Sequence, residues 1–101
     1  MAKRIANVIV DSPIRESLDY LVPADIEIQV GQRCLVPLGT RKVVGIVVGF
    51  SEESRFSKLR EVISRVDDIA PLSFGWLALT SFAARYYQSG WGQVAIPALP
   101  K

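Results

Sequence analysis

The sequence predicts a mainly β domain of the α+β class, a small curled sheet or β-barrel-like sheet with one C-terminal helix. Two observations lead to this fold class. Over the first two thirds of the chain, short runs of β-branched and aromatic residues alternate with closely spaced Gly and Pro turns. After Pro71, apolar residues instead recur at helical spacing. The length of 101 residues suits one core, so residues 1–101 are expected to form a single domain.

The expected strands are runs of β-forming residues bounded by turn residues. They are residues 5–10, 18–22, 33–37, 43–50 and 60–66. Pro23 ends the second strand because it cannot donate to a β-ladder. The alternating segment 26–30 then enters the third strand through a turn at Gly31. In the fourth strand, Gly45 and Gly49 indicate bulges or the close approach of another backbone.

The helix is expected to begin after Ser73, a typical N-cap residue, and to end near Gly90. Its apolar residues recur at helical spacing, and the aromatic stripe they form is expected to pack against the sheet as core; they are Trp76, Leu79, Phe82 or Ala83, and Tyr86. Residues 91–100 are expected to form an extended exit, with a linker starting in residues 95–101.

The composition excludes several functional classes. Histidine is absent, as are a phosphate-binding loop and a paired Cys-x-x-Cys, so neither an enzyme, a metal site nor a cofactor site is expected in this chain. The lone Cys34 lies in an apolar run and is expected to be a small buried hydrophobe. No membrane-length apolar segment or signal core is present, so a cytoplasmic location without membrane contact is expected. Twelve basic against ten acidic residues give a net charge of only +2, which predicts few phosphate contacts if the chain binds DNA.

The segment Leu18-Asp19-Tyr20 is the main candidate functional site. Leu and Tyr suit a strand, whereas Asp is depleted in strands and needs an explanation. Asp19 is either a water-facing residue at a sheet edge or the acceptor in a small pocket that receives a hydroxyl or an amine.

Several short motifs occur in an order that resembles a known family. They are DYLVP at 19–23, VGQRCLVPLG at 30–39, GIVVG at 45–49, LREVI at 59–63, the helix-like 76–87 and ALP at 98–100. Together they resemble the N-terminal 3′-DNA-binding domain of the PriA family of primosomal replication-restart helicases, over about residues 5–100. The resemblance implies that Leu18, Asp19, Tyr20, Gly39 and Arg60 hold the 3′-terminal nucleotide of a single strand. Leu18 stands where the family has Phe, which puts base stacking in doubt, and Arg60 stands where the family has Lys.

The resemblance also implies a function. The domain would bind the 3′-hydroxyl end of single-stranded DNA, the nascent leading strand at stalled forks in the bacterial nucleoid, without sequence preference. It would act as a monomeric module that positions a DNA helicase. ATP and zinc would belong only to the rest of the full-length protein, and a single-strand-binding protein and other primosome proteins would be further partners.

The residues themselves leave plainer roles open. Tyr20 also suits strand packing, Gly39 a turn with positive φ, and Arg60 a surface charge. Arg41 and Lys42 suit either a solvated hairpin tip or a phosphate contact. Two other functions therefore stay possible: a protein-interaction β-module, for example for the tail of a single-strand-binding protein, and a structural domain that packs on the rest of a longer chain.

Overall fold

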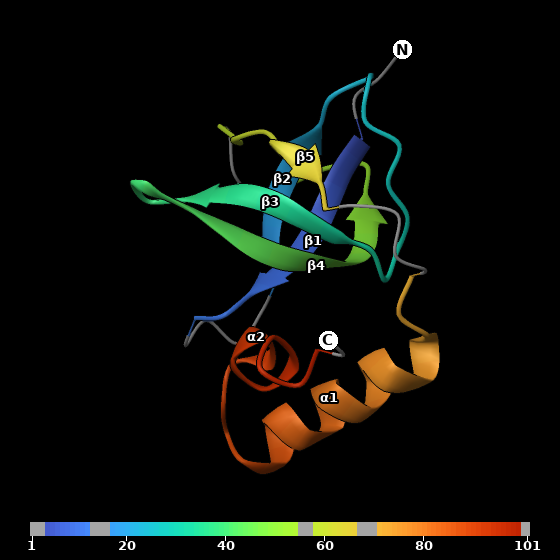
Figure 1. Ribbon diagram of the computed structural model, residues 1–101, viewed down its shortest axis with the longest axis vertical. Coiled ribbons are helices and arrows are strands. Elements are labelled where there is room, and N and C mark those ends of the chain that lie inside the picture. The colour runs from blue at the N-terminus through green and yellow to red at the C-terminus, as the bar shows by residue number, and fades with distance from the viewer. Residues whose placement is uncertain (1–3, 13–16, 55–57, 67–70, 100–101) are drawn as a thin grey trace.

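The computed structural model describes residues 4–12, 17–54, 58–66 and 71–99, which form a curled sheet resting on two helices (Figure 1). The strands are β1 Arg4–Val10, β2 Leu18–Val22, β3 Arg33–Leu38, β4 Arg41–Ser51 and β5 Ser64–Arg65. The sheet order is β2-β1-β4-β3-β5, with every neighbouring pair antiparallel. The helices are α1 Phe74–Tyr86 and α2 Trp91–Ala95. The predicted fold class, mainly β with a curled sheet, is confirmed; over the residues that the structure describes, the five strands do not form a closed barrel.

The long strand β4 gives the sheet its curl. It pairs with both β1 and β3, and its register against β1 shifts between Asn7 and Val8, so a bulge bends the strand beside Gly49. A side chain at Gly45 would overlap the side chain of Val8 and come within 2.9 Å of the carbonyl oxygen of Ile9. The bulge and the close approach expected from the two glycines are therefore both present.

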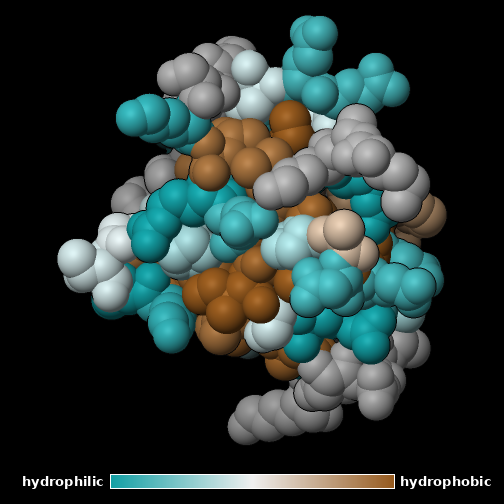
Figure 2. All heavy atoms as spheres, turned by 90° about the horizontal axis from the view of Figure 1, so that it is seen from above, coloured by the Kyte–Doolittle hydropathy of each residue, from teal (hydrophilic) through white to brown (hydrophobic). Residues whose placement is uncertain are grey.

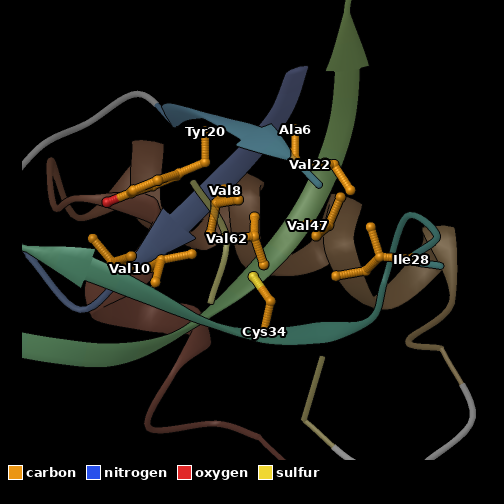
Figure 3. Close-up of a cluster of buried hydrophobic side chains, with 10 residues drawn as sticks. Ala6, Val8, Val10, Tyr20, Val22, Ile28, Cys34, Val47 and Val62 are labelled. Carbon is orange, nitrogen blue, oxygen red and sulfur yellow. The ribbon is translucent and has the colours of Figure 1, made fainter. Parts of the chain in front are cut away.

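The inner side of the curl holds the larger hydrophobic core. Alternate residues of β1 to β4 point into it, and Figure 3 shows their side chains converging, with Ile28 and Val62 added from outside these strands. Cys34 lies in this core with none of its surface exposed, as expected, and burial raises its pKa to about 12. A thiol in this position packs as a small apolar group.

One predicted strand is much shorter than expected, and the alternating segment before β3 is not a strand. Of residues 60–66 only Ser64–Arg65 is a strand, because this segment changes partner: Val62 donates to the carbonyl of Leu21 in β2 (2.9 Å), whereas Ile63 donates to the carbonyl of Leu35 in β3 (2.9 Å). Segment 26–30 is irregular, although its burial alternates, and Ile28 plugs the core. Residues 60–63 thus run between β2 and β3, far apart in the strand order.

The helices cover the other face of the sheet. There a second core joins Ile9 and Ile46 of the sheet to Leu77 of α1 and Ala95 of α2. The N-cap prediction is correct, because the Ser73 hydroxyl oxygen accepts a 3.1 Å hydrogen bond from the backbone N–H of Trp76.

The expectation of an extended exit after residue 90 is wrong, since residues 91–95 form α2. Gly92 allows this helix to lie directly on β1, where any side chain would overlap the carbonyl oxygen of Val10. The Trp91 indole N–H donates to the Thr80 hydroxyl at 3.0 Å and so ties α2 to α1. The helix is stabilised by these tertiary contacts, whereas its Gly and Pro content by itself disfavours a helix and so led to the wrong prediction.

The expectation that the large apolar residues of α1 form core is also largely wrong. Leu79, Phe82 and Tyr86 are 61–72% exposed, whereas α1 buries the stripe of Leu77, Thr80 and Ala84. Trp76 is the only member of the predicted set that packs against the second core. A helix that is apolar on nearly every side offers several faces to a core, and the short helix α2 fits the face with the smaller residues.

The end of the molecule away from the helices presents mostly hydrophilic side chains around an apolar area (Figure 2). Among the residues that the structure describes, no helix combines the length and the apolar character that crossing a membrane requires.

Candidate functional site

The five predicted site residues line one surface pocket. The pocket has a volume of about 260 Å³ and is formed by three segments that are far apart in sequence. Its lining residues are Leu18, Asp19 and Tyr20 of β2, Pro37, Leu38 and Gly39 at the end of β3, and Lys58, Leu59 and Arg60. This volume lies just below the range of about 300–1,000 Å³ typical of drug-sized ligands, so the pocket suits one small group.

Strand β2 divides its three site residues between the two faces of the sheet. Tyr20 belongs to the inner core and Leu18 packs against it, so the side chain of Asp19, between them in the alternation, points to the opposite face. Asp19 lies opposite Asn7 of β1 in the register. The carboxylate is therefore flanked by polar partners and not by the two bulky neighbours in its motif.

A small polar network holds the Asp19 carboxylate. Oδ1 accepts a hydrogen bond from the Asn7 amide at 3.0 Å, and Oδ2 accepts one from the Ser54 hydroxyl at 2.6 Å. The Asn7 amide also donates to the Ser51 hydroxyl at 3.1 Å. A carboxylate has about four acceptor positions, so Asp19 keeps acceptor capacity after binding both donors. The orientation of the carboxylate is thus fixed before any ligand arrives.

Tyr20 shapes the pocket and uses its hydroxyl internally. The side chain is only 4% exposed, and its hydroxyl donates to the carbonyl of Pro37 at 2.7 Å. Figure 3 shows the side chain pointing from β2 toward the margin of the cluster, away from Val22 and Val47. Burial raises the pKa of the Tyr20 hydroxyl, which the positive charge of Arg60 partly opposes. Tyr20 therefore has the packing role that the sequence left open, and it links β2 to the end of β3.

Gly39 and Arg60 meet at the rim of the pocket. Gly39 has a φ of +61° in the turn between β3 and β4, which is the left-handed region that favours glycine. Its carbonyl accepts a 2.7 Å hydrogen bond from Nη1 of Arg60. Arg60 is exposed, and the backbone bond from Leu21 N–H to its carbonyl (2.9 Å) fixes its position beside β2. The guanidinium has five N–H donors, so it can donate to a ligand while it holds the carbonyl of Gly39.

Sequence reasoning missed part of this site. It did not select the apolar walls Pro37, Leu38 and Leu59, the second rim cation Lys58, or the donors around Asp19. One signal was available: Asn7 interrupts an otherwise apolar strand, where asparagine is unfavourable unless it has a polar partner. Ser51 and Ser54 offered no signal, because the polar run that begins at Ser51 reads as an ordinary loop, although Ser51 is the last residue of β4.

The arrangement combines apolar walls and two cations with one fixed acceptor, the Asp19 carboxylate on the other face of the edge strand β2. Such a lining suits a small ligand with an apolar part, an anionic group and a hydrogen-bond donor. Within the described ranges, His, Cys, Asp and Glu side chains do not gather in groups of three that could hold a metal ion.

Comparison with known proteins decides the family. Residues 7–100 match the family model described as the 3′DNA-binding domain (3′BD) of PriA. The chain belongs to the PriA 3′BD family. The replication restart protein PriA of Haemophilus influenzae is 38% identical over 102 residues, which cover 96% of this chain. PriA of Rickettsia felis and PriA of Buchnera aphidicola are 30% and 29% identical, again over 96% of this chain.

This 3′BD chain matches only a small part of those relatives. It spans 14% of the length of the Haemophilus protein and 15% of the Rickettsia felis protein. Replication restart is the printed role of the whole relatives, whereas the 3′BD model describes DNA binding.

Proposed function

We propose that this 3′BD domain binds the 3′-hydroxyl end of single-stranded DNA, without sequence preference, by holding the terminal nucleotide in the pocket between β2, the β3–β4 turn and Arg60. The observation that supports it most is the convergence of Leu18, Asp19, Tyr20, Gly39 and Arg60 on one pocket in a chain that matches the 3′DNA-binding family. These residues come from three separate segments, so their meeting is not a consequence of sequence proximity.

Each wall has a role in the proposed complex. The apolar side chains of Leu18, Leu38 and Leu59 contact the base and make few demands on its identity, while Leu18 supplies less stacking than an aromatic residue would. The 3′-hydroxyl, a donor that exists only at a strand end, would reach around the edge strand β2 to the Asp19 carboxylate on its other face. Arg60 and Lys58 balance the charge of the nucleotide.

The carboxylate supplies the discrimination. A hydrogen bond to a charged group contributes about 1.5–3 kcal/mol, which corresponds to roughly ten- to a hundredfold in affinity. A 3′-phosphate would replace this bond with the approach of two anions. A strand that continued past the pocket would have no free hydroxyl to donate.

The test compares two fluorescent oligonucleotides that differ only in a 3′-hydroxyl or a 3′-phosphate, with anisotropy as the readout. The wild-type chain is expected to prefer the hydroxyl about ten- to a hundredfold, and Asp19→Asn is expected to lose that preference. Asp25→Asn is the matched control, because it removes an exposed carboxylate that lines a different surface. Equal binding of both oligonucleotides by the wild type would refute end recognition.

We extend the proposal to the longer protein. The domain would direct a replication-restart helicase to the nascent leading strand at stalled forks, in the cytoplasm and nucleoid of a bacterium. Unwinding, ATP hydrolysis and zinc binding would belong to other parts of the protein. This chain alone would be a monomeric binding module without catalytic activity, and primosome proteins would be partners of the whole.

A second candidate function is peptide binding, for example of the tail of a single-strand-binding protein. The outer face of α1 supports it: Phe74, Leu79, Phe82, Tyr86 and Tyr87 are all more than 60% exposed, with Phe82 and Tyr86 stacked at 6.5 Å. Arg85 is the one charged residue within 71–99, which suits a protein partner better than phosphates. Phe82→Ser would then weaken binding of the tail peptide and leave DNA binding unchanged, whereas Asp19→Asn would do the reverse.

A further inference from the structure

A groove adjoins the pocket proposed to hold the terminal nucleotide, here called the terminal pocket, on the side of the β3–β4 hairpin. Its volume is about 450 Å³, and it shares Pro37, Leu59 and Arg60 with the pocket. The two hollows are therefore adjacent, with Arg60 lining both. In Figure 1 the β3–β4 hairpin extends away from the two helices, which leaves its tip accessible.

The charges around this groove are unevenly distributed. Arg41 and Lys42, both exposed at the start of β4, line it together with Arg60. With Lys58 in the pocket, the two hollows have four basic residues among their lining, against the acids Asp19 and Glu61. The groove beside β5 has the opposite character, with Asp25 and Glu27 against Arg65. Among these three hollows, the positive potential is thus concentrated beside the hairpin.

We propose that the single strand leaves the terminal pocket across Arg60 and runs along this groove, where Arg41 and Lys42 contact the phosphates that precede the terminal nucleotide. This inference rests on the proposed end recognition, because that fixes which end of the strand occupies the pocket. The 3′ end lies at Asp19, so the strand extends in the 5′ direction toward the hairpin tip. Glu61 lies on the same groove and restricts the phosphates to its Arg41–Lys42 side.

The hairpin geometry suits this role. In the register of β3 and β4, Lys42 lies opposite Pro37 and Arg41 opposite Leu38. Both partners line the terminal pocket, so the two cations begin directly beside it. Because Gly39 turns the chain tightly at this point, the basic residues are carried on a rigid hairpin and not on a long loop.

The test uses the double variant Arg41→Gln/Lys42→Gln with a thymidine dinucleotide and a thymidine octanucleotide, both with a 3′-hydroxyl. For single strands the salt slope is about 0.7 per phosphate contact, so losing two contacts lowers it by about 1.4. The ratio of the wild-type affinity to the double-variant affinity for the octanucleotide is then expected to fall about sevenfold when the salt concentration rises about fourfold. The dinucleotide, with one internal phosphate, is expected to lose much less affinity in the variant.

Arg65→Gln/Arg85→Gln is the matched control, since it changes the net charge equally at two residues outside both hollows. An equal loss in the control and in the double variant would overturn the groove, because only overall charge would matter. An equal loss for dinucleotide and octanucleotide would overturn it too, since the cations would then act on the terminal nucleotide. Failure of end recognition itself appears separately, as equal binding of 3′-hydroxyl and 3′-phosphate strands by the wild type.

Discussion

The hydrogen bond between Asn7 and Asp19 gives a sharp prediction, because it tests whether the site is preorganised. In Asn7→Ala the carboxylate loses its 3.0 Å donor but keeps the Ser54 hydroxyl at 2.6 Å. A hydrogen bond to a charged group contributes about 1.5–3 kcal/mol, and the partial burial of both residues favours the lower value. For a domain of about 100 residues, about 1.5 kcal/mol corresponds to a fall in Tm of about 6–12 °C.

The assay is a double-mutant cycle followed by thermal unfolding. Asn7→Ala, Asp19→Ala and the double variant are expected to show a coupling free energy of about 1 kcal/mol, within the usual range for residues in direct contact. Ser51→Ala is the control, because it removes a partner of Asn7 but leaves the Asn7–Asp19 bond in place. The preference for a 3′-hydroxyl is expected to fall in Asn7→Ala, although Asn7 does not line the pocket.

Two results would refute this reasoning. Changes in the free energy of unfolding that add within about 0.3–0.5 kcal/mol would mean that the two side chains do not stabilise one another. An unchanged preference for the 3′-hydroxyl in Asn7→Ala, with the stability reduced, would mean that Asn7 supports the fold but does not orient the carboxylate.

Two further predictions concern the cores. The pKa of Cys34 is raised from 9.0 to about 12, so folding favours the protonated thiol, and the free energy of unfolding should fall as pH rises from about 9 to about 12. In urea titrations at several pH values, Cys34→Ala should show a smaller fall over this range. The same pH dependence in the variant and the wild type would contradict the prediction. On α1, Leu77→Ala should lower the free energy of unfolding by about 2–5 kcal/mol, because Leu77 is 5% exposed. Phe82→Ala should lower it far less, because Phe82 is 61% exposed. A similar fall in Tm in both variants would contradict the observed orientation of the helix.

The sequence predicted the strands well where a single physical signal dominated. Alternation and turn residues predicted the ends of β1 to β4 to within about two residues, and the glycines of β4 indicated its bulge. It failed where the partner of a segment decided the structure. Residues 60–66 looked like one strand, yet they pair first with β2 and then with β3, which no local pattern reveals.

The helical part failed for a related reason. Helix α1 has apolar residues on almost every side, so spacing alone could not choose which face meets the core. The choice depended on α2, which itself was hidden by Gly90, Gly92 and Pro97. Once α2 lies on β1 through Gly92, the small residues of α1 fit against it and the aromatic side chains remain outside.

The site was predicted through the family resemblance more than through physics. The resemblance selected five residues that do meet in one pocket, but it gave no reason for the orientation of Asp19. That reason lies in Asn7 and Ser54, 12 residues before and 35 residues after it in the chain. Such partners are brought together by the register of β1 with β2 and by the end of β4, which sequence spacing does not encode.

The proposed complex separates attraction from discrimination. Arg41, Lys42, Lys58 and Arg60 would attract any strand, through interactions that weaken with salt. The negative charge of Asp19 repels phosphates at one point of the site. Its hydrogen bond to a 3′-hydroxyl would offset that repulsion only when the 3′ end of the strand is bound. Because Asn7 and Ser54 already hold the carboxylate, little further ordering is required on binding, a saving of about 0.5–1.5 kcal/mol for an immobilised side chain. Raising salt should therefore weaken binding to both 3′-hydroxyl and 3′-phosphate strands while leaving a preference for the hydroxyl, since the Asp19 bond is short-ranged and partly shielded from solvent.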